Sequence, residues 1–364
     1  MTSSLSAAVI SLGSTSSKWT IKALKKYMRI VDDINIKDVE VTLSSKKQEI
    51  LYKGKPLENY DCVYTKGSFR YATLLRAVSL IASQNSYVPI KPSAFTIAHD
   101  KLLTQFKLQQ YGIPMPLTYL TATPEAAKKI LEKINYPVIM KFPKGTQGKG
   151  VMFADSFAGA NSMLDALTAL KQPFLIQEYV ETGGSDIRAI VVGDKVVAAM
   201  RRHAEIGEKR ANIHAGGKGE PAELDLKTRK LAVSAAEAIG ADICAVDILE
   251  SVKGPVVIEV NISPGLQGIT ESTNINVADK IAQFLYKKTK HIVESKKKIT
   301  ATEIIREVTP GKDIITHLDL RGERILLPDY VTKETKFSEK DEVVIKIKEG
   351  KLLIEKFDIG KNRK

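Results

Sequence analysis

The side chains with the clearest chemical potential are two carboxylates and an amide within or beside apolar segments. Asp247 interrupts the apolar run 245–249, and Glu259 stands in the run 256–260, two residues before Asn261. Buried carboxylates are costly unless they are paired or bind a cation. Residues two apart on a strand face the same side, so Glu259 and Asn261 share a face, and Asp247 can oppose Glu259 across a hairpin. Such oxygen ligands suit Mg²⁺ shared with nucleotide phosphates; the alternative is a structural ion pair with lysine or arginine.

A glycine-rich segment joins two predicted strands, 138–142 and 151–154. Its glycines and lysines are Lys144, Gly145, Gly148, Lys149 and Gly150. Backbone N–H groups of such a segment can approach phosphate oxygens closely, and the lysines add positive charge. The segment does not fit the Walker pattern, because no Ser or Thr follows a lysine and no helix pattern follows the glycines. It is therefore either a plain hairpin turn or a flexible lid over phosphates.

Several cations have both a functional and an ordinary interpretation. Lys141 stands in the middle of an apolar strand, and Lys101 begins a predicted helix. Each can reach an anion, or can simply extend into solvent. The basic run 201–203, with Lys209 and Arg210 beyond it, is either a solvated charged face or a clamp for a carboxylate or a transferring phosphoryl group.

The patterns that position these side chains predict an α/β protein of several parts. Strand and helix signals alternate through an N-terminal α/β domain at residues 1–95. Residues 96–293 form a central domain of α+β character, in which about 120–182 make a smaller subdomain. A lysine-rich linker, 294–313, and a β-rich module, 314–364, follow.

Length and composition limit the class of protein. The chain has 364 residues, near-average hydrophobic content and a formal net charge of +13, which suits an anionic ligand. No run is long enough to span a membrane, and the apolar run 7–12 has no basic flank before it, as a secretion signal would. With only Cys62 and Cys244, we expect no disulfide framework and a reducing, cytoplasmic location.

Taken in order, the motifs resemble the ATP-grasp superfamily, and most closely its RimK-like branch of glutamate ligases. The resemblance covers about residues 92–293. It rests on K-F-P-K-G-T-Q-G-K-G from Lys141, Q-E-Y-V from Gln177, D-I-R from Asp186, R-A-N-I-H-A-G-G from Arg210, A-V-D-I-L from Ala245 and E-V-N-I-S-P-G-L-Q-G from Glu259.

The resemblance implies a role for each matched position. The residues it assigns to ATP are Lys101, Lys141, Lys144, Gly145, Gly148, Gly150, Gln177, Glu178, Tyr179 and Asp186. The residues it assigns to the other substrates are Arg188, Arg202, Asn212, Ser263 and Gly265. Arg210 would stabilise the transferring phosphoryl group. Asp247, Glu259 and Asn261 would hold two Mg²⁺ ions, for which Mn²⁺ can substitute.

The implied activity is an ATP-dependent ligation in which glutamate is added to a carboxylate of a coenzyme or of a protein C-terminus, through an acyl phosphate. Two alternatives remain open: a ligase for another amino acid, and a nucleotide-sensing regulator that binds nucleic acid. Relatives that modify ribosomal protein tend to carry acid-Arg-Arg where this chain has Arg201-Arg202-His203, so the acceptor stays undetermined. Residues 314–357 resemble a swapped-hairpin AbrB-type module, which implies a homo-oligomer and possible contact with DNA.

Overall fold

The computed structural model divides the chain into two units, Met1–Lys296 and Lys297–Lys364, which are described separately. The described residues are 3–143, 150–169, 171, 173–204, 218–308, 319–321, 324–327, 331, 335–338, 341–348 and 351–357. Among them, no helix is both long and apolar enough to cross a lipid bilayer.

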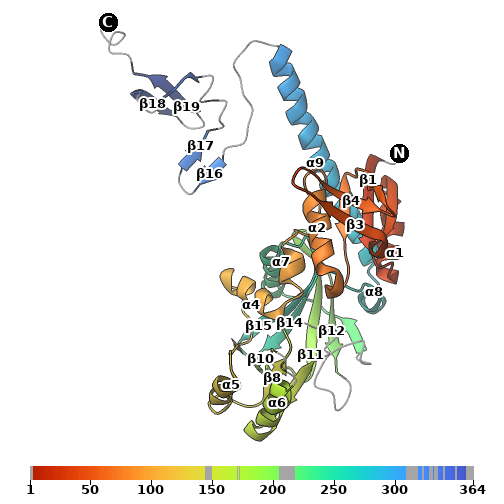
Figure 1. Cartoon of the computed structure of the whole chain (residues 1–364), viewed down its shortest axis with the longest axis vertical. Helices are drawn as coiled ribbons and strands as arrows, with labels where there is room; N and C mark the ends of the chain where they lie inside the picture. Colours follow the sequence, from red (N-terminus) through yellow and green to blue (C-terminus); the bar gives the residue numbers. More distant parts are fainter. Residues whose placement is uncertain are drawn as a thin grey trace. The chain divides into compact units, whose positions relative to one another are not determined.

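The first unit begins with a small parallel sheet, which we call the N-terminal layer together with its helices (Figure 1). The strand order is β2-β1-β6, with β1 in the centre and parallel to both neighbours. The bounds are β1 Ser3–Ser11, β2 Met28–Asn35, β6 Cys62–Thr65, α1 Thr15–Leu24 and α2 Ala72–Ala82. Helix α1 starts at Thr15 because the Ser14 hydroxyl accepts the N–H of Ser17, which is a typical N-cap.

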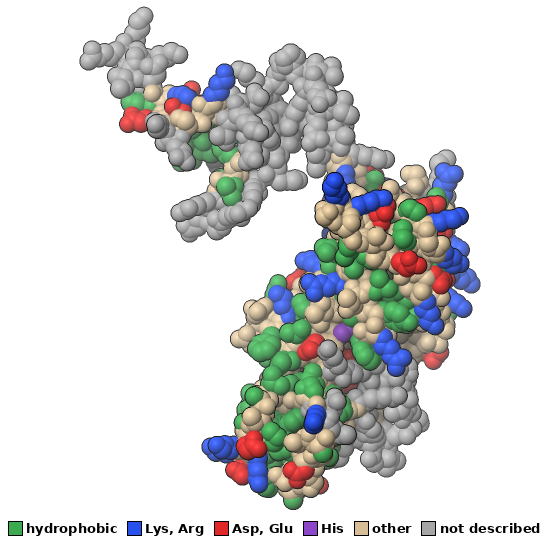
Figure 2. Space-filling model, viewed as in Figure 1, with side chains coloured by type: hydrophobic (Ala, Val, Ile, Leu, Met, Phe, Trp, Pro, Cys, Tyr) green, Lys and Arg blue, Asp and Glu red, His purple; other side chains and the backbone are tan. Residues whose placement is uncertain are grey.

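A short antiparallel sheet accompanies this layer. Its strands are β3 Val39–Leu43, β4 Gln48–Tyr52 and β5 Lys55–Pro56, and single 3₁₀ turns stand at Ile36–Asp38 and Phe69–Tyr71. Figure 2 shows Lys and Arg side chains gathered over the N-terminal layer, around α1. Lys18, Lys22, Lys25 and Lys26 of this region are all exposed, so part of the positive charge counted in the sequence lies in solvent.

The largest sheet of the first unit is antiparallel, with the strand order β13-β12-β11-β14-β15. Its bounds are β11 Ser185–Val192, β12 Lys195–His203, β13 Lys218–Pro221, β14 Ile243–Ser251 and β15 Gly254–Asn261. Helix α7 contacts four of these strands, and α4 packs on α7 and β15. The helices of this part are α3 Ala94–Ile97, α4 Lys101–Gln110, α7 Leu226–Ile239 and α8 Gln267–Thr273. This sheet and the N-terminal layer share one hydrophobic core.

A smaller sheet has a hydrophobic core of its own. Its strand order is β7-β10-β8-β9, and α5 and α6 pack against each other beside it. The bounds are β7 Thr118–Tyr119, α5 Pro124–Leu131, β8 Val138–Lys141, β9 Val151–Ala154, α6 Phe157–Ala169 and β10 Leu175–Glu178. A separate core lets a subdomain keep its internal packing when its neighbours are altered. This is the segment for which the sequence predicted a smaller subdomain at about 120–182.

The last helix, α9, differs from the sequence prediction. It runs from Val277 to Val308, so residues 294–308 of the predicted linker are helical. The lysine run at 296–298 does not break the helix, since lysine is a good helix former.

In the second unit, two antiparallel hairpins are described: β16 Asp319–Arg321 with β17 Arg324–Leu326, and β18 Val343–Lys348 with β19 Lys351–Lys356. The mixture of helices and sheets confirms the predicted α/β class.

Two glycines with left-handed backbone test how tightly α9 packs on the large sheet. Gly193 turns β11 into β12 at φ +64°, and a Cβ there would lie 2.4 Å from Cε2 of Phe284 on α9. Gly54 has φ +74° with nothing within 4 Å of a Cβ. Both alanine variants incur the same backbone strain, and only Gly193→Ala adds a steric clash. We expect Gly193→Ala to lose about 1–3 kcal/mol more unfolding free energy than Gly54→Ala in urea denaturation. Equal losses would contradict the close packing.

Candidate functional site

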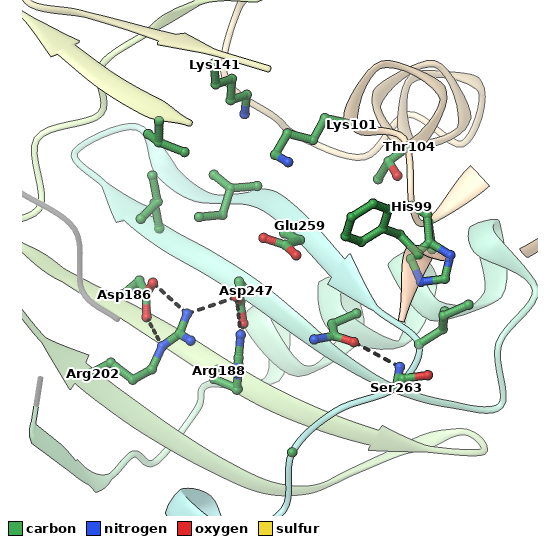
Figure 3. Close-up of a pocket in the computed structure, with 18 of the residues that line it drawn as sticks. His99, Lys101, Thr104, Lys141, Asp186, Arg188, Arg202, Asp247, Glu259 and Ser263 are labelled. Carbon is green, nitrogen blue, oxygen red and sulfur yellow. Dashed lines mark hydrogen bonds and ion pairs between the residues drawn. The ribbon is translucent and has the colours of Figure 1, made fainter. Parts of the chain in front are cut away.

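A cavity of about 650 Å³ lies within the first unit, where loops of the N-terminal layer, the smaller sheet and one face of the large sheet meet. Its volume falls within the range of small-molecule sites, roughly 300–1,000 Å³. The charged side chains that line it are Lys66, Lys101, Lys141, Arg188, Arg202, Glu178, Asp186, Asp247 and Glu259. Figure 3 shows most of them from one viewpoint.

Strand register brings the two predicted carboxylates and the amide together. In the β14–β15 hairpin Asp247 pairs with Glu259, and Ala245 pairs with Asn261. Glu259 and Asn261 are two residues apart on β15, so the three side chains share the face that lines the cavity. The Oδ1 atom of Asn261 also accepts the N–H of Ser263 at 2.9 Å, which fixes the direction of the amide.

Asp247 is ion-paired as well, which was the alternative interpretation of the sequence. Arg188 donates from Nε to Oδ1 at 2.8 Å and from Nη2 to Oδ2 at 2.7 Å, and Nη2 of Arg202 lies 2.9 Å from Oδ2. Burial alone would raise the pKa of Asp247, but the two guanidinium groups outweigh it and hold that pKa at about 2. The carboxylate is therefore ionised at every physiological pH.

The same network includes Asp186, which pairs with Arg202 across β11 and β12. Arg202 donates to the two oxygens of Asp186 at 2.6 and 2.7 Å. Burial and the nearby charge of Asp247 raise the pKa of Asp186 to about 6, although Arg202 lowers it. Two arginines and two aspartates form this group, which we call the Arg–Asp network (Figure 3, dashed lines).

The donor set fits a magnesium ion. A carboxylate offers about four lone-pair positions, and the arginines use one on Oδ1 and two on Oδ2 of Asp247, so one on Oδ1 is left. Glu259 and Asn261 add oxygen ligands on the same face. In the described part of the chain no cluster of three or more His, Cys, Asp or Glu side chains is arranged to hold a metal ion. Hard oxygen ligands from two carboxylates and an amide are those that Mg²⁺ prefers.

Two lysines lie on the opposite side of the cavity from the Arg–Asp network and extend toward Glu259 (Figure 3). Lys141 is only 6% exposed and donates from Nζ to Oε1 of Gln177 at 2.7 Å. Gln177 in turn donates to the Thr118 hydroxyl at 2.7 Å. Burial, together with the charge of Lys101, lowers the pKa of Lys141 to about 8, although the charge of Glu259 opposes the shift. Burial also lowers the pKa of Lys101. The Lys141 side chain thus reaches the cavity and not the solvent.

Of the remaining predicted residues, Glu178 and Tyr179 line the cavity, and Gly150 directly precedes Val151, which lines it. The Glu178 carboxylate accepts the N–H of Leu117, and the Tyr179 ring packs edge-on against Phe153. The Gly150 carbonyl accepts the N–H of Phe142 and closes the β8–β9 hairpin. Ser263 and Gly265 line the cavity. Five predicted residues lie outside the described part of the chain: Lys144, Gly145, Gly148, Arg210 and Asn212.

Sequence reasoning missed the contribution of the N-terminal layer. Lys66, directly after β6, is 5% exposed and lines the cavity, and the next residue, Gly67, donates its N–H to the Ser263 hydroxyl at 2.9 Å. Ser14 and Ser17 of α1 line it too. A lysine that directly follows the short buried strand 61–65 is the signal that could have singled out Lys66.

Comparison with known proteins gives a consistent result. A family model described as the RimK-like ATP-grasp domain matches residues 98–285. A probable alpha-L-glutamate ligase of Thioalkalivibrio sulfidiphilus is 40% identical over 248 residues, covering 67% of this chain and 82% of that protein. Its counterpart in Vibrio cholerae is 37% identical over 278 residues, covering 75% and 91%.

Solved structures show the fold. The ATP-grasp ligase PsnB, complexed with a minimal precursor, Mg and ADP, superposes with a TM-score of 0.63 at 19% identity, covering 80% of this chain and 100% of that one. A RimK domain protein from Sphaerobacter thermophilus superposes with a TM-score of 0.59 at 20% identity, covering 76% and 98%.

Neighbouring arginines on β12 test the energetic importance of the Arg–Asp network. Arg202→Met would leave two buried carboxylates with Arg188 as their remaining network partner, and we expect a loss of about 3–5 kcal/mol in unfolding free energy. Arg201 pairs with Glu250 nearer the surface, where the two side chains are 30% and 47% exposed, so Arg201→Met should cost at most about 1 kcal/mol. Chemical denaturation of both variants at neutral pH measures the difference. Similar small losses would show that the network contributes little to stability.

Proposed function

This chain belongs to the RimK-like ATP-grasp family and is an enzyme that forms a carbon–nitrogen bond; from this premise we propose that it adds L-glutamate to a carboxylate of a coenzyme or of a protein C-terminus. The reaction would consume ATP and release ADP and phosphate. The choice of glutamate is supported by the names of the curated relatives.

One observation carries the proposal. The β14–β15 hairpin presents Asp247, Glu259 and Asn261 on one face, and Lys101 and Lys141 extend toward that face from two other elements. Oxygen ligands for a cation and ammonium groups for phosphates thus meet in one cavity, which is the arrangement that transfer of a phosphoryl group from ATP needs.

The chemistry requires no nucleophile from the protein. An oxygen of the acceptor carboxylate attacks the γ-phosphorus of ATP, the bond from that phosphorus to the β–γ bridging oxygen breaks, and ADP leaves. The amine nitrogen of glutamate then attacks the acyl carbon, a carbon–nitrogen bond forms, and phosphate leaves as the amine loses a proton. Conversion of the carboxylate to an acyl phosphate supplies the good leaving group.

The residues of the chain would bind and orient the reactants. Lys101 and Lys141 would neutralise phosphate charge, and Arg210 would stabilise the phosphoryl group in transfer. Two Mg²⁺ ions, or Mn²⁺ in their place, would be held by Asp247, Glu259 and Asn261 and would further offset the charge of the triphosphate.

The rim of the cavity would bind the nucleoside and the other substrates. Glu178 and Tyr179 would contact adenine, Gln177 would also contact ATP, and Asp186 would lie near the ribose. In the Arg–Asp network, Arg188 and Arg202 hold Asp186 and Asp247 in place, so their part in substrate binding would come through the guanidinium N–H groups that the carboxylates do not use.

The role of Glu259 can be tested by removing only its charge. Glu259→Gln should lower the rate of glutamate-dependent ADP release by more than the roughly 10–100-fold loss typical of outer-shell partners of a metal ligand. Glu259 is the better target than Asp247, because replacing Asp247 would also remove the carboxylate partner of Arg188 and one of the two carboxylate partners of Arg202. The matched control is Glu250→Gln, on the same hairpin with a side chain that is 47% exposed, which should keep normal activity. Normal turnover by Glu259→Gln would refute the metal assignment.

Amino-acid specificity is measured with the same enzyme. Purified protein, ATP and MgCl₂ are combined with each amino acid and with candidate acceptors, and product is scored as ADP release and as mass gain of the acceptor. A gain of one glutamyl residue is expected. Ligation of a different amino acid would overturn the choice of glutamate and leave the ligase chemistry in place.

Lys141 provides an independent test of nucleotide binding. Lys141→Met removes a buried ammonium group, and we expect the KM for ATP to rise about 10–100-fold, as for loss of a charge-assisted hydrogen bond. Lys107→Met on α4 is the control, since Lys107 is on the outside of the protein and pairs with Gln110. Calorimetric titration with ADP and Mg²⁺ should show the same weakening for Lys141→Met alone.

A further inference from the structure

Lys66 is a buried cation without a polar partner in the described part of the chain. Its side chain is 5% exposed, its ammonium group makes no hydrogen bond or ion pair there, and Nζ lies 5.9 Å from the centroid of the Tyr64 ring. Burial lowers the pKa of Lys66 to about 8. Burying an unpaired charge costs several kcal/mol. A lysine at such a place therefore indicates a role other than stability.

The topology of the N-terminal layer places Lys66 beside the start of α1. Strands β1 and β6 are parallel, Ile10 pairs with Thr65, and the N–H of Lys66 donates to the Ile10 carbonyl at 2.9 Å. The residues that follow both strands therefore emerge at the same edge of the sheet. After β1 these residues lead into α1, and Ser14 and Ser17 of that turn line the same cavity as Lys66.

The beginning of α1 supplies further hydrogen-bond donors beside the ammonium group of Lys66. The first N–H groups of a helix have no acceptor within the helix, and the helix dipole makes this end positive. The Ser14 hydroxyl caps one of these groups, that of Ser17. An ammonium group, first-turn N–H groups and hydroxyls together are the chemistry that binds an anion.

Two hydrogen bonds connect this part of the N-terminal layer to the loop after Asn261. Gly67 donates its N–H to the Ser263 hydroxyl at 2.9 Å, and Leu266 donates its N–H to the Ser16 hydroxyl at 2.8 Å. Asn261, whose amide accepts from the Ser263 N–H, belongs to the proposed metal set. These bonds hold Lys66 and the start of α1 in a fixed position beside the loop after Asn261, close to the proposed metal set.

We propose that Lys66 and the first turn of α1 form a carboxylate subsite. This subsite holds a carboxylate group of a substrate, and that group is not the one that is phosphorylated. The inference rests on the proposed function, in which the carboxylates of glutamate do not react and an acceptor with more than one carboxylate also brings one that does not react. Lys101 and Lys141 come from other elements and serve the nucleotide, so ATP does not need Lys66. Lys66 positions a substrate and takes no part in bond making.

Kinetics of Lys66→Met, with Lys66→Gln as a second neutral variant, test the subsite. We expect the KM of one carboxylate substrate to rise about 10–100-fold, with the KM for ATP within about twofold of wild type. A rise for glutamate assigns the subsite to glutamate, and a rise for the acceptor assigns it to the acceptor. Lys22→Met, an exposed lysine on the last turn of α1, is the matched control and should change neither value.

Three outcomes overturn the subsite. These are unchanged KM values in both Lys66 variants, a rise confined to ATP, and a fall in kcat with every KM unchanged. Thermal unfolding accompanies the assays, because removing a buried unpaired charge should leave the fold as stable as wild type or more stable. A variant that unfolds at lower temperature would show that Lys66 serves the fold.

A binding measurement separates this inference from the proposed function. L-Glutamate and the acceptor are each titrated calorimetrically into wild type and Lys66→Met in the presence of ADP and Mg²⁺, where no turnover occurs. Loss of binding of one of them in the variant supports the subsite even if wild type ligates a different amino acid. Equal binding to both proteins overturns the subsite even if glutamate is ligated, and the same holds if neither ligand binds wild type.

Discussion

Compensation of charge in an apolar sheet is the constraint on which the rest of this structure depends. Asp186 and Asp247 are less than 10% exposed, and each is paired to an arginine directly opposite it on the neighbouring strand. Because Asp247 is also opposite Glu259, the register that satisfies the arginines is the register that presents both carboxylates to the cavity. A slip of one residue between β11 and β14 would turn these side chains to the other face and remove both features.

The cavity is a product of three elements, and none of them contains a complete site. The large sheet supplies carboxylates, the smaller sheet supplies Lys141 with Gln177, and the N-terminal layer supplies Lys66. Serine hydroxyls connect the layer to the sheet, since Ser16 and Ser263 each accept a backbone N–H from the other side. Short polar contacts of this kind fix relative position with little buried area.

The sequence was most informative where a charge interrupts an apolar run. It singled out Asp247, Glu259, Asn261 and Lys141, which the structure places around one cavity, because the alternation of strands puts them on definite faces. It could not show that Asp247 is shared between arginines, since that depends on pairing between strands about 60 residues apart. Lys66 directly follows a short buried strand, which is a local signal, but its place beside the start of α1 depends on the parallel pairing of β6 with β1, two strands far apart in the sequence. The end of α9 was missed because lysines favour a helix as readily as a solvated linker.

The two cysteines have a practical consequence. Cys62 is on a strand of the N-terminal layer and Cys244 is on a strand of the large sheet, and both are free thiols with no exposed surface. Burial raises the pKa of Cys62 to about 12, and that of Cys244 is raised as well, so neither forms a reactive thiolate in the folded chain. An alkylating reagent therefore modifies only molecules that have opened. The rate of alkylation at each cysteine would report, without any added label, how often its own sheet opens.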